Sequence, residues 1–258
     1  MGIIELERLA AQHWRGSEEE RLGDWLLRAA EGFTGRANSA LPLGDPGLPL
    51  DEALAAVWAW YRARRLPPMI AVPLPLDEAQ VRAEGPALCH FDHNLSERAW
   101  LTRPGPAFVM TADIASVGTR AALPGDAEFR VDAEPDNAWL AAYHHRGQWR
   151  QSPVMRQLLM SAPSQAFASI RFGDDAVAIG RLSLSAGWAG ITAVEVDPGW
   201  RRTGLGRALT VGLCAEAASR GASRVFLQVE TGNTAALRLY ERCGFMYSHR
   251  YHYRMSPS

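Results

Sequence analysis

The stretch that decides the fold is residues 191–209, ITAVEVDPGWRRTGLGRAL. Apolar and polar residues alternate in its first part, which predicts a strand that ends at the Asp-Pro-Gly turn of residues 197–199. From Leu205 onward, apolar residues recur every three or four positions, which predicts a helix that ends at Gly221. Backbone N–H groups at the start of a helix have no partner within it, so the loop between strand and helix is a candidate anion-binding site.

The loop has the composition expected of a phosphate-binding loop. Gly204 and Gly206 lack Cβ atoms, so a phosphate can approach the backbone closely. Three arginines add positive charge: Arg201, Arg202 and Arg207. The loop lacks the Gly-Lys-Ser/Thr of a Walker A motif, and Leu209 stands where a dinucleotide-binding GxGxxG motif has its third glycine. We therefore expect a pyrophosphate ligand, and the simpler alternative is a turn with solvated arginines.

A second strand and helix follow the first pair. Residues 224–230, RVFLQVE, alternate as a strand, and Asn233 is a good N-cap for a helix over residues 234–243. Asn233, Ala236 and Tyr240 are spaced so that they lie on one face of that helix. The face would present an amide and a phenol to a ligand. In the alternative interpretation Tyr240 is a core aromatic residue and Asn233 is only a cap.

Taken together, these motifs resemble a known superfamily. The pattern RxxGxG at residues 201–206, followed by NTAALxLYExxGF at residues 233–245, resembles the GNAT superfamily of acetyl-CoA-dependent N-acetyltransferases, over roughly residues 127–258. The resemblance implies an α/β fold with a mixed sheet, acetyl-CoA as cosubstrate and no metal. The residues implied to bind acetyl-CoA are Val194, Val196, Arg201, Arg202, Thr203, Gly204, Leu205, Gly206, Arg207, Asn233, Ala236 and Tyr240.

The reaction that the resemblance implies is direct transfer of the acetyl group to an amine. The deprotonated amine attacks the thioester carbonyl, and Tyr240 protonates the leaving thiolate. A backbone N–H on the strand that precedes the glycine loop, with Val196 as the nearest candidate, stabilises the oxyanion. Glu195 is the expected general base, because it lies on the cofactor strand and faces away from Val194 and Val196. A solvated strand carboxylate is the alternative interpretation of Glu195.

The assignment of the base has competitors. Some members of the superfamily carry a glutamate twelve residues before the tyrosine, where this chain has Gln228, an amide that cannot act as a base. Glu230 lies two residues further on and faces the same side of the strand. Four histidines are further candidates: His144, His145, His249 and His252. Cys243 has no neighbouring motif that marks a nucleophile and is interpreted as a packing residue.

The N-terminal half carries a second resemblance. Residues 24–39, DWLLRAAEGFTGRANS, are similar to the opening of a two-lobed actinobacterial GNAT group described as N-acetylglutamate synthase-like. Residues 1–120 are then a degenerate GNAT-like lobe that shapes the substrate pocket or has a structural role, and residues 127–258 are the catalytic domain. Arg28 and Arg36 are candidate partners for substrate carboxylates, because a guanidinium matches a carboxylate well. The alternative is that both arginines lie on the surface.

The first lobe is not expected to bind acetyl-CoA. After Asp-Pro-Gly at residues 45–47, Leu-Pro-Leu replaces the basic glycine loop, and proline has no N–H to offer an anion. The two Asp-Pro-Gly turns lie in a similar order of strands and helices. The similar order of elements indicates either that one α/β unit was duplicated or that a common turn occurs twice by coincidence.

Periodicity and turn residues predict the remaining elements. The expected helices are residues 2–13, 51–65, 77–84, 137–145 and 154–161. The expected strands are residues 24–30, 33–43, 69–74, 108–117, 128–132, 166–172, 176–185 and 188–197. Residues 121–126 are expected to connect the two lobes.

The composition excludes several classes of function. The 258 residues include 28 acidic and 27 basic residues, all of the latter arginine, and the formal net charge is -1. Bulk binding of nucleic acid needs clustered positive charge and is not expected. The three cysteines indicate neither a disulfide framework nor a zinc site, and no apolar run is long enough to span a membrane. We expect a cytoplasmic monomer or homodimer with a small-molecule amine as its partner.

Three functions remain open at this point. The leading hypothesis is an acetyl-CoA-dependent N-acetyltransferase that acts on the amine of a small metabolite such as L-glutamate. The second hypothesis moves the acceptor to a protein or peptide amine. The third is an acyl-CoA-binding module without turnover, which Gln228 in place of a glutamate would favour.

Overall fold

One large mixed sheet dominates the computed structural model, which describes residues 1–118, 122–144 and 153–257. In spatial order its eight strands are β4 (Met69–Leu74), β11 (Met246–Met255), β5 (Leu101–Asp113), β10 (Arg224–Glu230), β9 (Trp188–Val196), β8 (Asp175–Ser185), β7 (Ser164–Phe172) and β6 (Glu128–Asp132). β9 and β10 run parallel, and the other neighbouring strands run antiparallel. The expected mixed α/β fold is confirmed.

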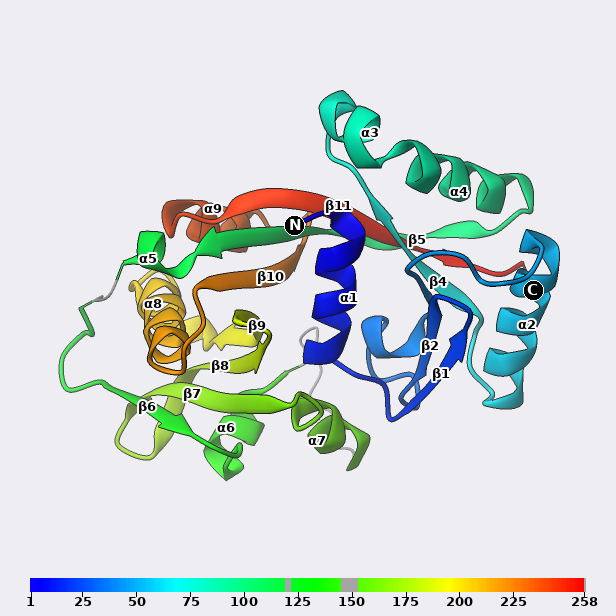
Figure 1. Cartoon of the computed structure of the whole chain (residues 1–258). Coiled ribbons are helices and arrows are strands. Elements are labelled where there is room, and N and C mark those ends of the chain that lie inside the picture. The colour runs from blue at the N-terminus through cyan, green and yellow to red at the C-terminus, as the bar shows by residue number, and fades with distance from the viewer. Residues whose placement is uncertain (119–121, 145–152, 258) are drawn as a thin grey trace.

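β5 places both halves of the chain in the same sheet. It precedes residue 120 in the sequence, yet it lies between β11 and β10, the last two strands of the chain. β5 and β11 run side by side across the molecule, from the region of α9 (Thr234–Arg242) to that of α2 (Leu50–Ala63), as Figure 1 shows. Residues 1–120 and 127–258 are therefore joined through a continuous hydrogen-bonded ladder.

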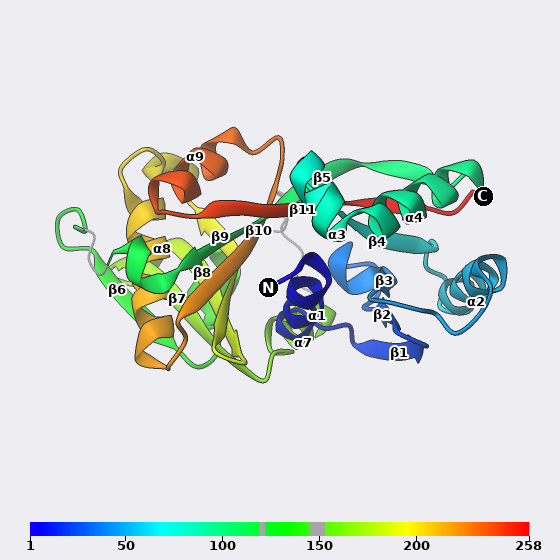
Figure 2. The ribbon, with the colours of Figure 1, turned by 45° about the horizontal axis from the view of Figure 1, so that its top comes forward.

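Helices cover both faces of the large sheet. Along β10, Val225 and Leu227 pack into the core formed with α8 (Leu205–Ser219) and α9. Phe226 faces the other way and packs with α1 (Ile3–His13), because successive side chains of a strand point to opposite faces. α1 lies between the two halves of the molecule (Figure 2).

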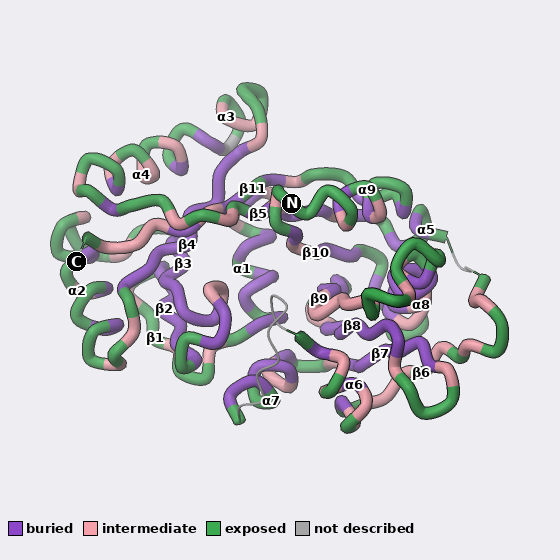
Figure 3. Tube along the Cα trace, turned by 180° about the vertical axis from the view of Figure 1, so that it is seen from behind, coloured by how far each residue is buried: buried purple, intermediate pink, exposed green. Residues whose placement is uncertain are grey.

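A smaller antiparallel sheet extends the large one in the N-terminal half. It consists of β1 (Glu18–Leu22), β2 (Trp25–Ala29) and β3 (Leu41–Pro42), and α2 packs against it. A parallel bridge between Ala40 and Ile70 joins this sheet to β4. α3 (Glu78–Glu84) and α4 (Pro86–Glu97) then lead from β4 to β5, and Figure 3 shows how exposed both helices are compared with the strands.

Two expected strands are wrong in part. Residues 33–43 contain the 3-10 turn η1 (Arg36–Asn38) and only the short strand β3. The reason is Asn38, whose Oδ1 accepts hydrogen bonds from the N–H groups of Ala30 and Gly32 over 2.8 and 2.9 Å and folds the segment back. The strand expected to end at residue 117 ends at Asp113, and α5 (Ile114–Val117) follows it.

Other elements differ from expectation at their ends or were not expected. α6 (Asn137–Ala142) and α7 (Pro153–Leu159) are each shorter than predicted, and η2 (Pro198–Trp200) follows β9. β1, α4 and β11 have no counterpart among the expected elements. In the three described ranges of the chain, no helix is both long enough and apolar enough to cross a bilayer.

Candidate active site

An opening between β9 and β10 forms the centre of the candidate active site. The two strands pair in parallel from Trp188 and Arg224 up to Ile191 and Leu227, and the described pairing ends there. Beyond that point β9 stays paired with β8, and β10 stays paired with β5. Past this point, the main-chain N–H and C=O groups on the facing edges of β9 and β10 do not hydrogen-bond to each other among the described residues. An extended ligand can hydrogen-bond to such edges as an added strand does.

A bulge in β9 sets the direction of the side chains beside this opening. The register with β8 shifts by one residue around Ala193, whose φ is +53°. A bulge re-aims the residues that follow it. Val194 and Val196 pack against the core beneath α8, whereas Glu195 stands opposite Ile179, a core residue of the other face. The predicted cofactor contacts and the predicted base thus lie on opposite faces of the strand.

The loop before α8 has the geometry of an anion site. Gly204 is the N-cap residue of α8 with φ +93°, and Arg202 also has a positive φ, +68°. Arg201 Nε donates to the carbonyl of Val196 over 3.3 Å, which ties the loop to the end of β9. Arg201, Arg202 and Arg207 are exposed. A row of free N–H groups with three arginines matches the donors that a pyrophosphate needs.

Three predicted cofactor residues also have packing or turn roles. A Cβ on Gly206 would lie 3.1 Å from Leu239 Cδ2, so this glycine lets α8 pack closely on α9. Leu205 is buried in the core, so it can offer a ligand only its backbone. The Thr203 hydroxyl donates to the carbonyl of Trp200 over 2.6 Å and closes the turn before the helix.

Glu195 has the environment of a general base. Its side chain is half-buried, and burial raises its pKa to about 7, against the smaller opposing effects of His144 and Arg201. The main-chain N–H of His144 donates to one carboxylate oxygen over 2.7 Å, and His144 Nδ1 lies 3.6 Å from the other. A carboxylate with a pKa near 7 can take up and release a proton at neutral pH. The Glu195 carboxylate is therefore partly shielded and bonded to His144, which favours the base over a solvated strand carboxylate.

The predicted residues of α9 lie as the helical spacing indicates. Tyr240 is buried, its ring centroid lies 5.7 Å from that of Phe245, and burial raises the pKa of its hydroxyl. The phenol therefore keeps its proton at neutral pH. Asn233 Oδ1 accepts the N–H of Ala236 over 3.2 Å, which confirms the N-cap. Cys243 is buried and burial raises the pKa of its thiol, in agreement with a packing residue.

Two of the histidines that are alternative candidates for the base, His249 and His252, have partners away from the site. His249 is fully buried, with Nε2 2.8 Å from Glu7 Oε1. His252 Nε2 lies 2.8 Å from Asp92 Oδ1, which also accepts from an arginine of β11. His145 lies outside the described residues. His144 remains beside the site, where it contacts the predicted base itself.

The β10 residues that were considered as bases have different surroundings. Gln228 is half-buried, and its Oε1 accepts the Tyr251 hydroxyl over 3.4 Å. Glu230 is exposed at the end of the strand. Gln228 cannot act as a base, and Glu230 is exposed, whereas Glu195 is half-buried beside the opening, so the geometry favours Glu195.

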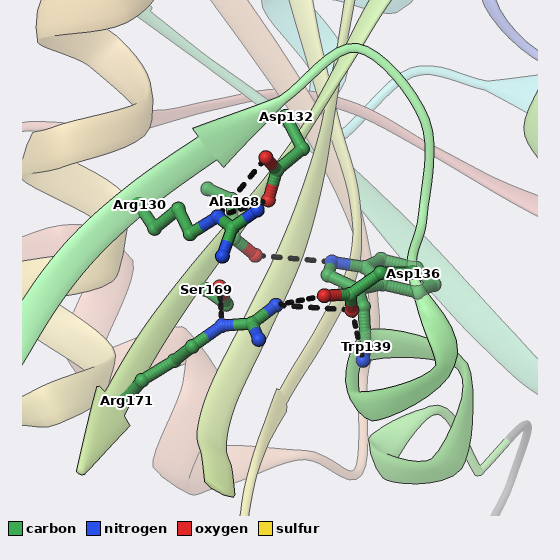
Figure 4. A network of polar contacts seen from close by, with 7 residues as sticks. All are labelled: Arg130, Asp132, Asp136, Trp139, Ala168, Ser169 and Arg171. Carbon is green, nitrogen blue, oxygen red and sulfur yellow. Dashed lines mark hydrogen bonds and ion pairs between the residues drawn. The ribbon is translucent and has the colours of Figure 1, made fainter. Parts of the chain in front are cut away.

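A polar network that was not expected from the sequence positions the helix that covers Glu195 (Figure 4). One nitrogen of the Arg171 guanidinium donates to both carboxylate oxygens of Asp136, over 2.9 and 3.0 Å. Asp136 also accepts the Trp139 N–H at the start of α6, and the Trp139 indole donates to a carbonyl of β7 over 3.0 Å. The end of α6 leads directly to His144, so the network places His144 on Glu195. An Asp just before an expected helix was the available signal.

The two arginines considered for the substrate have different surroundings. Arg28 is buried and donates from Nε to the carbonyl of Ser39 over 3.2 Å, so it is bonded within the N-terminal half. Arg36 is half-buried, and its Nε has no hydrogen-bond partner in the part of the chain that the structure describes. The pKa of Arg181, lowered chiefly by burial, is lowered further by the charge of Arg36. Arg181 on β8 was missed by sequence reasoning. Its Cζ lies 5.3 Å from the centre of the Trp14 ring, and the Trp14 indole donates to the hydroxyl of Thr34, two residues before Arg36.

Known proteins resemble the chain over nearly its whole length. A family model described as "Probable histone acetyltransferase Rv0428c C-terminal" matches residues 2–254. The protein named Probable histone acetyltransferase Rv0428c, from Mycobacterium tuberculosis, is 30% identical over 267 residues, which cover 99% of this chain and 74% of that protein. Mycothiol acetyltransferase from Thermobispora bispora is 31% identical over 227 residues, 87% of this chain and 67% of that protein.

A solved structure agrees with these matches at the level of the fold. The GCN5-related N-acetyltransferase from Kribbella flavida superposes with a TM-score of 0.71 at 17% identity, covering 100% of this chain and 97% of that one. The family match, the two relatives and the phosphate-type loop before α8 agree with one another. The chain therefore belongs to the GNAT N-acetyltransferases, as a member of the family described by the Rv0428c C-terminal model, and it is an acyltransferase.

Proposed function

We propose that this N-acetyltransferase transfers the acetyl group of acetyl-CoA directly to the amine of a small molecule, with Glu195 as the general base. The observation that carries the proposal is the half-buried Glu195 carboxylate, with a pKa of about 7, on the strand that borders the opening. The loop of residues 201–207 would bind the pyrophosphate, and the backbone of Val194 and Val196 would bind the pantetheine arm. Asn233 and Ala236 would contact the cosubstrate from α9.

The proposed chemistry is a single acyl transfer. Glu195 takes a proton from the bound ammonium, directly or through water, which frees the nitrogen lone pair. The nitrogen bonds to the thioester carbonyl carbon, and the backbone N–H of Val196 stabilises the oxyanion. The C–S bond then breaks, and Tyr240 donates its proton to the leaving thiolate. The attacking nitrogen loses its second proton to water as the amide forms, and the Tyr240 phenolate takes a proton back from water. Burial raises the pKa of its hydroxyl, so Tyr240 holds its proton before the reaction begins.

A small acceptor is the first choice because Arg36, from the N-terminal half, is proposed to contribute to the acceptor pocket. Arg36 comes from residues 1–120 and its charge acts on Arg181 of β8, so the first half of the chain is proposed to shape the acceptor pocket. L-glutamate is the first compound to test. A protein or peptide amine is the second candidate, because the matching family and the Mycobacterium tuberculosis relative are described as histone acetyltransferases.

Thiol release from acetyl-CoA in the presence of an amine panel tests the proposal. The panel contains free amino acids, diamines and peptides with free N-termini or lysine side chains, and mass spectrometry identifies the acetylated product. Turnover with small amines and not with peptides supports the first choice. Stabilisation by coenzyme A with no product from any amine supports an acyl-CoA-binding module instead.

A further inference from the structure

Arg181 is fully buried, and one nitrogen of its guanidinium has no hydrogen-bond partner among the described residues. Its Nε donates to the carbonyl of Leu159 over 2.6 Å, and its Nη1 donates to the carbonyl of His13 over 3.0 Å. Nη1 also lies 3.3 Å from the Thr192 hydroxyl. Nη2 is buried and has no hydrogen-bond partner among the described residues. These three contacts therefore fix the guanidinium and leave Nη2 as a donor without a partner among the described residues.

A second guanidinium with an unused nitrogen belongs to a segment that lies near the first. Arg181 Cζ lies 5.3 Å from the centre of the Trp14 ring, and the Trp14 indole donates to the hydroxyl of Thr34, two residues before Arg36. Arg36 Nε is also buried without a hydrogen-bond partner in the described ranges, and its charge contributes to the lowered pKa of Arg181, which burial brings to about 9. The charge of Arg36 also acts on Glu7, but that carboxylate is bonded to His249 over 2.8 Å. A buried cation such as Arg181, with no ion-pair partner among the described residues and a second, half-buried arginine nearby, costs free energy, which a bound anion would offset.

The segment that follows the site cannot supply that counterion from its side chains. Residues 145–152 read HRGQWRQS and contain no aspartate or glutamate. Of the ion pairs recorded for the described residues, none involves Arg181 or Arg36. An anion from outside the chain is therefore the remaining partner of the right charge.

Arg181 and Glu195 point to the same face of the sheet, because Ile179 pairs with Glu195 and Arg181 lies two residues after Ile179 on β8. Arg181 pairs with Thr192 across β8 and β9, three residues before Glu195 on the same strand. Tyr143 packs in the same buried cluster as Ile179, the residue paired with Glu195, and the charges of Glu195, Arg181 and Arg36 all act on its hydroxyl. A molecule that contacts the two arginines can therefore also reach the carboxylate of Glu195.

We propose that Arg181 Nη2 and Arg36 Nε bind an anionic group of the acceptor, a carboxylate in the first instance, while the acceptor amine meets Glu195. The acceptor is then an amine that carries a negative charge of its own, such as an amino acid, rather than a simple cationic amine. The link to the amine rests on the proposed function. The anion site itself does not, so it can be tested without turnover.

The binding test uses protein saturated with coenzyme A, which occupies the other anion site. Acetate, succinate, glutarate and inorganic sulfate are titrated at constant ionic strength, with glutaramide as the neutral match of glutarate, and the midpoint of thermal unfolding is followed. We expect a dicarboxylate to bind at least about tenfold more tightly than glutaramide. If sulfate binds more tightly than the carboxylates, the anion site is still supported, and the anionic group of the acceptor is then a sulfate or phosphate.

Arg36→Met is the decisive variant, because Arg36 is half-buried and its loss leaves the fixed bonds of Arg181 intact. Anion binding should fall about tenfold in this variant. Arg82→Met, which removes an exposed arginine of α3, is the matched control and should bind as the wild type does. Anions that stabilise no better than glutaramide, or Arg36→Met that binds them undiminished, would overturn the proposal.

The activity test compares acceptors that differ only in charge, glycine with glycinamide and L-glutamate with L-glutamine. We expect the more acidic member of a pair to have the higher kcat/KM, and Arg36→Met to remove the preference. Equal kcat/KM values within each pair would contradict the anion proposal and leave acetyl transfer intact. Failure of coenzyme A itself to stabilise the protein would contradict the proposed function, so the two failures are distinguishable.

Discussion

The main-chain N–H of His144 donates to the Glu195 carboxylate over 2.7 Å, and this bond joins the end of α6 to the strand beside the opening. The bond favours the charged form of Glu195 and so lowers its pKa. Burial acts in the opposite direction and is the larger effect, so the pKa is about 7. The protonation of Glu195 therefore depends on how closely the end of α6 covers it.

Replacement of Glu195 by Gln removes the proposed base and keeps the shape of the side chain. We expect kcat to fall by about 10²–10⁴-fold, because general base catalysis contributes about that much. Affinity for coenzyme A, measured by calorimetry, should stay unchanged, since Glu195 faces away from Val194 and Val196. A variant with wild-type turnover would show that another group removes the proton.

The pH dependence of turnover should report the raised pKa of Glu195. A base acts in its deprotonated form, so kcat/KM for the amine should fall as pH drops through about 7, instead of near 4.5 as for an ordinary glutamate. In Glu195→Gln the residual activity should lose this limb and keep only the dependence that belongs to the amine. A wild-type profile that is flat between pH 6 and about 8 would argue against Glu195.

Replacement of Tyr240 by Phe removes the proposed acid and leaves the ring in the core. The ring packs beside Phe245, so the free energy of unfolding should change little. Turnover with acetyl-CoA should fall by about 10²-fold, because the thiolate must leave without a proton. The expected KM for acetyl-CoA is unchanged, and a raised KM with normal kcat would assign Tyr240 to cosubstrate binding.

The parts of the site that were predicted from the sequence are local in the chain. The loop before α8 and the cap of α9 depend on residues that lie within a few positions of each other, such as Gly204 beside the helix start and Asn233 three residues before Ala236. Their chemistry can therefore be recognised as a short motif. The roles of these residues toward acetyl-CoA stay predictions until a complex is measured.

The parts that were missed depend on contacts between distant residues. Arg181 bonds to the carbonyl of His13, 168 positions away, and nothing in the alternation of β8 marks that arginine as buried. His144 meets Glu195 across 51 positions. The strand expected over residues 33–43 failed for a different reason, since the Asn38 side chain competes with a neighbouring strand for the backbone N–H groups.

Replacement of Arg171 by Met should loosen α6 and change the proton affinity of Glu195. The loss of two bonds to Asp136 should lower the free energy of unfolding by about 1–3 kcal/mol. With α6 less firmly held, Glu195 becomes more exposed, so the pH at which turnover falls should move down, toward the ordinary pKa of 4.5. Circular dichroism checks that the variant is folded.

Arg130 supplies the matched control for this change. It belongs to the same polar network but is exposed and pairs with Asp132, so it does not hold α6 (Figure 4). Arg130→Met should keep the wild-type pH profile. A shift of equal size in both variants would show that the surface charge of this region sets the pKa of Glu195, and not the position of α6.

Replacement of Gly204 by Ala tests the loop before α8 as the pyrophosphate site. Gly204 has φ +93° and no atom within 4 Å of an added Cβ, so the change strains only the backbone, by about 1–2 kcal/mol. Gly221, just beyond the other end of the same helix, has φ +85° and equally open surroundings, so Gly221→Ala has the same expected cost in stability. Only Gly204→Ala should also weaken coenzyme A binding, by about tenfold or more, because a shift of the loop misaligns the N–H groups that bind the pyrophosphate. Equal affinities for coenzyme A in the two variants would place the pyrophosphate elsewhere.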